Sequence, residues 1–254
     1  MFLINMKKGF IDRLYWVIEN SDLLIEVADA RFPEKTRNKR IEGQIKRKGK
    51  ELIIVLNKSD LISKNNAGKI KKEIQKEFDC VFVSSVKKQG FKKLREKIMI
   101  AIKNSGDTIG IIGYPNTGKS SVINSLSKKK VRTSITAGYT RGQQVINAGK
   151  FKLIDSPGII PMEEREENEL VLIGAKNPFH LNYPEEAAIK LIELLKEKNP
   201  KALKELGAKE EKDSDKILEE IAVKKGRLMK KGIPDIKAVS KQILLDWQKG
   251  KIKM

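Results

Sequence analysis

The sequence contains one cysteine and no apolar stretch that approaches the roughly 20 residues needed to span a bilayer. A lone Cys80 forms neither an intramolecular disulfide nor the thiolate cluster of a structural zinc site, so neither stabilises the fold. The first segment does not have the pattern of a signal peptide, because an amphipathic stretch interrupted by Asp12, Arg13 and Glu19 follows it. We therefore expect a cytoplasmic location and no membrane partner.

Positive charge is what the sequence has in excess. Its 254 residues include 53 Lys and Arg against 33 Asp and Glu, a net charge of +20 at neutral pH. Hydrophobic residues make up 39%, which is enough for a buried core, and 34% charge with both signs present argues against disorder. This excess favours a polyanion, either nucleic acid or an anionic membrane face, and alone it identifies neither.

Short β-branched runs alternate with amphipathic helical patterns over the first two thirds of the chain. Such alternation predicts a doubly wound, parallel α/β sheet, in which ligands bind at the carboxyl ends of the strands. The runs are residues 23–28, 52–56, 81–83 and 108–112, and the helical patterns are residues 37–48, 66–78 and 91–103.

After Pro161 the strand patterns stop, and the sequence predicts helices and loops for the rest of the chain. Helical patterns cover about residues 184–197, 214–225 and 235–248, separated by prolines and glycines. We place a domain boundary near residue 175, which gives an α/β domain of residues 1–175 and a small all-α domain of residues 176–254. The basic excess is shared by both parts.

A phosphate-binding loop is the strongest motif. Gly113-Tyr-Pro-Asn-Thr-Gly-Lys-Ser120 fits G-x-x-x-x-G-K-[ST] and lies after an apolar run and before a helical pattern. Its N–H groups and the positive helix N-terminus hold phosphate oxygens, while the lysine neutralises the β and γ phosphates and the serine hydroxyl ligates Mg²⁺. A ligand-free glycine turn would need neither the lysine nor the hydroxyl. The expected nucleotide contacts are Asn116, Thr117, Gly118, Lys119, Ser120 and Ser121.

A second motif selects the base. Asn57-Lys58-Ser59-Asp60 follows an apolar run, so it also lies at the carboxyl end of a predicted strand. The carboxylate of Asp60 can accept hydrogen bonds from guanine N1–H and the 2-amino group, whereas adenine would leave it unpaired at a cost of about 1–3 kcal/mol. Alone the tetrapeptide is a weak match in a lysine-rich chain, but its position at the carboxyl end of a predicted strand, combined with the phosphate loop, indicates GTP or GDP as the ligand.

Three further segments complete the predicted site. Asp155-Ser-Pro-Gly158 places Asp155 to hold a water of the Mg²⁺ shell and Gly158 to bring its N–H to the γ-phosphate. The alternative is that this segment is simply a turn. Thr140 is the candidate threonine that closes on Mg²⁺ and γ-phosphate, with Thr133 and Thr136 as alternatives. Ser84, Ser85 and Val86 follow another run and would give backbone contacts to the guanine oxygen.

These motifs occur in an unusual order. Ordinary small GTPases begin with the phosphate loop and place the guanine motif fourth, whereas here Asp60 precedes Lys119 and the order is circularly permuted. The chain resembles the circularly permuted GTPases of the YlqF/YawG group, and Asp29-Ala-Arg-Phe-Pro33 with Arg37 resembles the signature that follows their first strand. The resemblance implies a permuted P-loop GTPase domain, residues 1–175, followed by an all-α domain, residues 176–254.

The resemblance also implies a function. It is that of a monomeric ribosome-assembly GTPase that binds ribosomal RNA or a maturing subunit, with RNA contacts from the helical domain. Lys224-Lys-Gly-Arg-Leu-Met-Lys-Lys231 is compatible, because lysines near a phosphate backbone gain affinity by counterion release, although a solvated helix end would look similar. Since the segment after Gly158 leads straight into the helical domain, we hypothesise that the nucleotide state sets the affinity for RNA.

The group that drives hydrolysis is not identified by the sequence. Ile159 stands where many GTPases carry a water-positioning glutamine. The YlqF branch resembles a solution that uses an N-terminal histidine, and this chain has no histidine before His180. His180 itself is expected to be a packed or exposed side chain rather than a base. The sequence therefore indicates the YawG branch. In related GTPases without the glutamine, the asparagine equivalent to Asn116 coordinates K⁺, which implies slow turnover that K⁺ stimulates.

Two other functions fit the same residues. The chain could be a GTP-dependent regulator of a protein partner, with its charge serving solubility, or an RNA-binding module with negligible hydrolysis.

Overall fold

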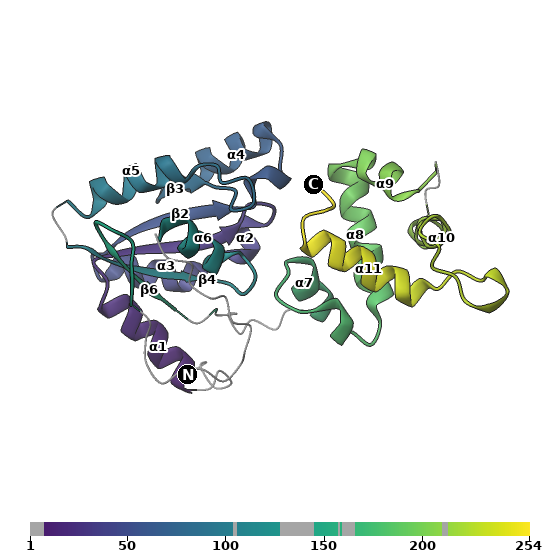
Figure 1. The fold of residues 1–254 in the computed structure, drawn as a ribbon, viewed down its shortest axis with the longest axis horizontal. Helices are drawn as coiled ribbons and strands as arrows, with labels where there is room; N and C mark the ends of the chain where they lie inside the picture. The colour runs from purple at the N-terminus through teal and green to yellow at the C-terminus, as the bar shows by residue number, and fades with distance from the viewer. Residues whose placement is uncertain (1–7, 104–105, 128–144, 157, 159–165, 210–212) are drawn as a thin grey trace. The chain divides into compact units, whose positions relative to one another are not determined.

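The computed structural model describes residues 8–103, 106–127, 145–156, 158, 166–209 and 213–254 (Figure 1). The chain divides into two compact units, Met1–Glu163 and Glu164–Met254. The sequence suggested a boundary near residue 175, and the second unit begins earlier because α7 (Glu167–Leu172) packs against α8 (Pro184–Lys198) and α11 (Ile236–Gln248).

The first unit is built on a six-stranded sheet with the strand order β3-β2-β1-β4-β6-β5. Neighbouring strands are parallel except β5 and β6, which are antiparallel. The predicted doubly wound α/β sheet is thus confirmed, but the short strands β5 and β6 are not among the four runs read from the sequence. The strands are β1 (Leu23–Asp29), β2 (Glu51–Asn57), β3 (Asp79–Phe82), β4 (Thr108–Gly113), β5 (Val145–Asn147) and β6 (Lys152–Asp155).

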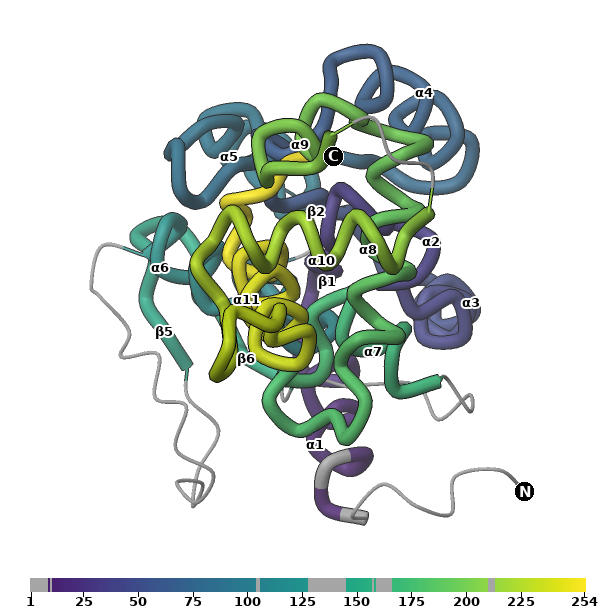
Figure 2. The backbone as a smooth tube through the Cα atoms, turned by 90° about the vertical axis from the view of Figure 1, so that its right-hand side faces the viewer, coloured from purple at the N-terminus to yellow at the C-terminus, as the bar shows by residue number. Residues whose placement is uncertain are grey.

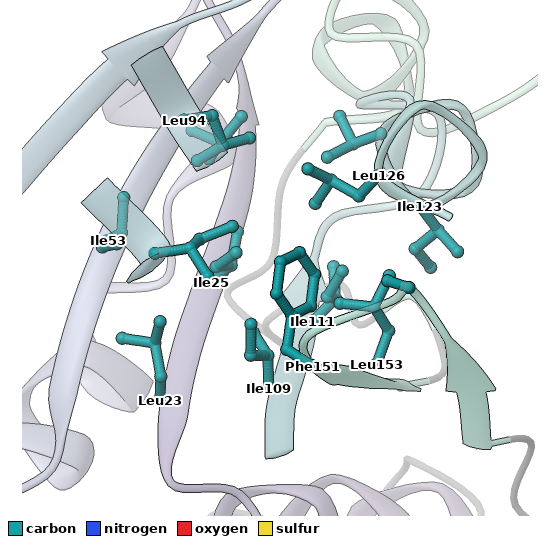
Figure 3. Packing of buried hydrophobic residues seen from close by; sticks show 14 of the residues in the cluster. Leu23, Ile25, Ile53, Leu94, Ile109, Ile111, Ile123, Leu126, Phe151 and Leu153 are labelled. Carbon is teal, nitrogen blue, oxygen red and sulfur yellow. The ribbon is translucent and has the colours of Figure 1, made fainter. Parts of the chain in front are cut away.

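Helices cover both faces of this sheet. On one face α5 (Phe91–Ala101) and α6 (Lys119–Leu126) pack onto a core that includes Leu23, Ile25 and Ile109 (Figure 3). On the other face α1 (Lys8–Glu19), α3 (Lys39–Arg47) and α4 (Lys64–Ile74) pack around Leu24 and Ala28. Successive residues of β1 serve opposite faces, as the two-residue period of a strand requires, so both faces must be apolar.

The second unit is all helical, as predicted. The three helical patterns read from the sequence correspond to α8, α10 (Ser214–Lys224) and α11, which pack around one core together with α7 (Figure 2). Trp247 is fully buried, and its Nε1 donates to the carbonyl of Leu172 at 2.8 Å, which satisfies the end of α7. Shorter elements are η2 (Pro178–His180), α9 (Pro200–Leu206) and η3 (Lys230–Gly232).

Within the described ranges, no helix has the length and apolar character that crossing a membrane requires.

Candidate functional site

The phosphate loop connects β4 to α6. Three of its residues have positive φ: Gly113 (150°), Asn116 (59°) and Gly118 (90°). Gly118 is the N-cap of α6 and has no side chain that could accept from the first N–H groups, so these donors remain for an outside acceptor. Thr117 is buried, and its hydroxyl donates to the carbonyl of Tyr114 at 2.9 Å, which closes the loop from the inside.

Asn57 joins this loop to two others. Its Nδ2 donates to the carbonyl of Thr117 at 2.9 Å, and its Oδ1 accepts from the backbone N and the hydroxyl of Ser85 at 3.2 and 3.0 Å. The asparagine side chain is buried at the carboxyl end of β2. A Cβ on Gly118 would lie 2.1 Å from Asn57 Nδ2, so the close approach requires glycine there. The base motif, the serine segment and the phosphate loop therefore meet at one edge of the sheet.

The base side of this edge is formed by two turns. Asp60 lies half-buried in the short helix η1 (Ser59–Leu61), which is anchored by the backbone N–H of Ser59 donating to the carbonyl of Val83 at 3.1 Å. Ser84 is buried, and its hydroxyl accepts from the N–H of Lys87 at 3.0 Å. Val86 is exposed.

Lys119 and Asp155 face each other at the phosphate side. The ammonium of Lys119 donates to the carboxylate of Asp155 and, at 2.6 Å, to the carbonyl of Ser156. Asp155 is the last residue of β6 and is the register partner of Ile111 in the neighbouring parallel strand β4, so it lies at the carboxyl end of the sheet. Gly158 approaches the loop as well, because a Cβ there would lie 3.3 Å from the backbone N of Pro115.

This set of groups fits a nucleoside triphosphate with Mg²⁺. Lys119 and the uncapped N–H groups of α6 offer positive charge to phosphate oxygens. Ser120 at the start of α6 and Asp155 offer the two oxygen ligands that Mg²⁺ commonly takes from protein, with phosphates and waters supplying the rest. In the described part of the chain no three His, Cys, Asp or Glu side chains cluster as a metal site.

Some predicted residues fall elsewhere. Thr140, with its alternatives Thr133 and Thr136, and Ile159 lie outside the described residues. His180 is exposed in η2 of the second unit. The sequence did not predict a contact of Lys58, whose Nζ donates to Asp29 Oδ2 at 2.8 Å. The only sequence feature that pointed to Asp29 was its place in the Asp-Ala-Arg-Phe-Pro signature.

Together the sheet and these loops define a P-loop GTPase fold in circularly permuted order, since the base motif on β2 precedes the phosphate loop between β4 and α6. Comparison with known proteins agrees with this class. The chain belongs to the RsgA GTPase family, whose model matches residues 8–164. A second family model, described as 50S ribosome-binding GTPase, matches residues 108–225.

Relatives with known sequences match more than nine tenths of the chain. A GTP-binding protein of Methanocaldococcus jannaschii, named as uncharacterized, is 38% identical over 93% of this chain and 64% of its own length. Nucleolar GTP-binding protein 2 of Saccharomyces cerevisiae is 36% identical over 99% of this chain and 54% of its own length. The chain thus spans between about half and two thirds of these relatives.

Two solved structures share the fold. The GDP-bound structure of YlqF superposes with a TM-score of 0.68 at 22% identity, covering 94% of this chain and 95% of that one. GNP-bound YlqF from T. maritima gives a TM-score of 0.64 at 21% identity, with coverages of 97% and 96%. The circularly permuted GTPase predicted from motif order is confirmed, while assignment to the YawG branch stays a prediction.

Proposed function

We propose that the protein binds GTP at this edge of the sheet, hydrolyses it to GDP and phosphate, and uses the nucleotide state to control binding to ribosomal RNA or a maturing ribosomal subunit. The observation that supports this most directly is the bond from Asn57 Nδ2 to the carbonyl of Thr117 at 2.9 Å. It brings a base-reading segment and a phosphate-reading segment within reach of one nucleotide.

Each segment then has a chemical role. Asp60 accepts from guanine N1–H and the 2-amino group, and the backbone of Ser85 and Val86 donates to the guanine oxygen. The ammonium of Lys119 moves from Asp155 to the β and γ phosphates when nucleotide binds. The carboxylate of Asp155 is then available, with Ser120, for Mg²⁺, which supplies charge stabilisation at the phosphates. Thr140 and the N–H of Gly158 complete the γ-phosphate contacts.

The base preference can be tested by changing the donor and acceptor pattern of Asp60. We expect wild-type protein to bind GDP at least about 100-fold more tightly than ADP, because adenine leaves the carboxylate unpaired. Asp60→Asn should lose GDP affinity and gain affinity for xanthosine diphosphate, whose C2 carbonyl can accept from the new amide. Asp79→Asn, at an exposed carboxylate paired with Lys97, is the matched control and should leave both affinities unchanged. Equal binding of ADP and GDP would refute the proposed site.

Hydrolysis is expected to be slow and dependent on K⁺. Asn116 lies in the phosphate loop with φ of 59° and is exposed, where its side-chain carbonyl can help hold a monovalent cation beside the phosphates. Such a cation would supply charge to the transition state. Phosphate release should be faster in KCl than in NaCl at equal ionic strength and should fall by at least about 10-fold in Lys119→Ala. Identical rates in both salts would remove the K⁺ role.

The segment between α10 and α11 supports the RNA-binding part of the proposal. It is a closed turn, in which the N–H of Met229 donates to the carbonyl of Ile233 at 2.7 Å and the N–H of Asp235 donates to the carbonyl of Arg227 at 2.8 Å. Leu228, Met229 and Ile233 are exposed to between 46% and 53%, so this turn offers apolar surface. Exposed Lys230 and Lys231 lie between them, which suits a nucleic acid whose phosphates flank accessible bases.

Co-sedimentation with separated ribosomal subunits, in GDP and in a non-hydrolysable GTP analogue, tests this part. The double variant Lys230→Gln, Lys231→Gln should weaken binding and flatten its dependence on salt. The double variant Lys69→Gln, Lys72→Gln, on the exposed side of α4, removes the same charge and should change neither. Binding without salt dependence would favour a protein partner. Subunit binding that is equal in GDP and in the GTP analogue, and that is unchanged in Lys119→Ala, would favour an RNA-binding module with negligible hydrolysis.

A further inference from the structure

The segment that follows β1 is wound around one buried carboxylate. Asp29 Oδ1 accepts from the backbone N of Arg31 at 3.0 Å and from its Nε at 3.1 Å, and Oδ2 accepts from Arg31 Nη2 at 2.8 Å. The side chains of Asp29 and Arg31 are both 0% exposed. The backbone N of Asp29 donates to the hydroxyl of Thr36 at 3.0 Å, which closes the loop back onto the strand end.

One donor to this carboxylate comes from outside the segment. Lys58 Nζ donates to Asp29 Oδ2 at 2.8 Å, and the lysine side chain is 18% exposed. Asp29 and Asn57 are register partners in the parallel pair β1 and β2, so the carboxylate stands beside the strand end from which Lys58 departs. Lys58 itself has φ of 61°, a left-handed conformation that is uncommon for a residue with a side chain and that turns its stem toward Asp29.

The electrostatics show that this contact is a charged one. Burial raises the pKa of Asp29, but the cations of Arg31 and Lys58 outweigh burial and lower it to about 2. Burial lowers the pKa of Lys58, and the Asp29 carboxylate opposes that change. The carboxylate is therefore ionised at neutral pH and attracts the ammonium of Lys58.

We propose that Asp29, held in place by Arg31, is a positioning residue for the guanine base and acts through Lys58. Lys58 lies two residues before Asp60, so a purine read by Asp60 lies beside the four-carbon stem of the lysine. Because the ammonium is anchored, the stem is ordered before the nucleotide arrives, and binding does not have to order it. The proposal rests on the proposed guanine site and gives the Asp-Ala-Arg-Phe-Pro segment a role in it.

The test separates the base side of the site from the phosphate side. We expect Asp29→Asn to weaken GDP binding about 10-fold, the scale of ordering one long side chain. Binding of tripolyphosphate, which engages the phosphate loop alone, should stay unchanged. The matched control is Glu73→Gln, which removes an exposed carboxylate paired with the exposed Lys76 on another part of the chain and should change neither ligand.

A second variant keeps the test decisive if the Asp29→Asn change leaves Arg31 too poorly paired for folding. Lys58→Met keeps an unbranched stem without the ammonium, so it should also weaken GDP and spare tripolyphosphate. In the Lys58→Met background, Asp29→Asn should add less than about a 2-fold further loss, because the two residues act as one unit. Full additivity, an unchanged GDP affinity, or equal losses for GDP and tripolyphosphate would overturn the proposal. Wild-type protein that fails to bind GDP at all would instead refute the proposed function.

Discussion

The side-chain amide of Asn57 donates to the backbone carbonyl of Thr117 at 2.9 Å, across a sequence separation of 60 residues. The same side chain accepts from Ser85 through its amide oxygen, so one buried residue connects three loops. In a permuted chain these loops cannot be joined by local structure, and the bond forms only once β2, β1 and β4 lie side by side.

Asn57→Ala should therefore lower both stability and nucleotide affinity. The change leaves the carbonyl of Thr117 and the N–H of Ser85 without this partner, which costs about 1–3 kcal/mol in the free energy of unfolding. Urea denaturation and GDP titration measure the two effects. Asn65→Ala, at an exposed site in α4, is the control and should stay within about 0.5 kcal/mol of wild type. Unchanged GDP affinity in Asn57→Ala would show that the three loops do not act together.

Two glycine substitutions should change different properties of the protein, one its nucleotide affinity and the other its stability. Gly118→Ala places a Cβ 2.1 Å from Asn57 Nδ2 at a residue with φ of 90°, so it should disturb the phosphate loop and reduce GDP affinity by at least about 10-fold. Gly68→Ala lies within α4, where a Cβ meets nothing within 4 Å, and should stabilise the protein by up to about 1 kcal/mol. Isothermal titration and thermal melting distinguish them. A Gly118→Ala protein with wild-type affinity would contradict the close packing of these two loops.

Glu26 should make stability fall as the pH rises. It is fully buried in β1, where burial and the neighbouring Glu42 carboxylate raise its pKa well above the usual range. A carboxyl with a raised pKa in the folded state contributes stability that is fully present below the unfolded value near 4.5 and is lost as the pH rises through the folded value.

Glu26→Gln removes this titration while keeping an oxygen that can accept from the N–H of Asn38, which lies 2.7 Å from Oε1 of the wild-type glutamate. The variant should be more stable than wild type at pH 8 and lose less stability between pH 5 and pH 8. Urea midpoints across that range measure the difference. Glu77→Gln, an exposed carboxyl on the segment after α4, should leave the wild-type slope. Parallel curves for Glu26→Gln and wild type would contradict the assignment.

Trp247→Phe should destabilise the second unit and spare the nucleotide site. It removes the bond from Nε1 to the carbonyl of Leu172 and leaves that acceptor without this partner, at a cost of about 1–3 kcal/mol. GDP affinity should not change, because the Trp247 contact lies within the second unit. Trp16→Phe, at a residue that is 37% exposed in α1, is the control for tryptophan removal. A Trp247→Phe protein as stable as wild type would show that α7 is not held by this bond.

The phosphate loop, the guanine motif and the alternation of strands and helices could all be recognised from the order of the amino acids. Each is a contiguous segment whose residue types and spacing fix its local conformation, as with Gly118 and Lys119 at the start of α6. The all-α character of the second unit was equally readable, because the helical period of α8, α10 and α11 is local.

Which distant residues contact one another depends on how the strands and helices pack together. Asp29 meets Lys58 because the parallel register of β1 and β2 sets it opposite Asn57, and register depends on the packing of the whole sheet. Glu26 is fully buried because helices cover both faces of β1, an arrangement that depends on how distant segments pack. Likewise, α7 is tied to the second unit by the hydrogen bond from Trp247 to the carbonyl of Leu172. The two residues are 75 positions apart, so no local pattern encodes their contact.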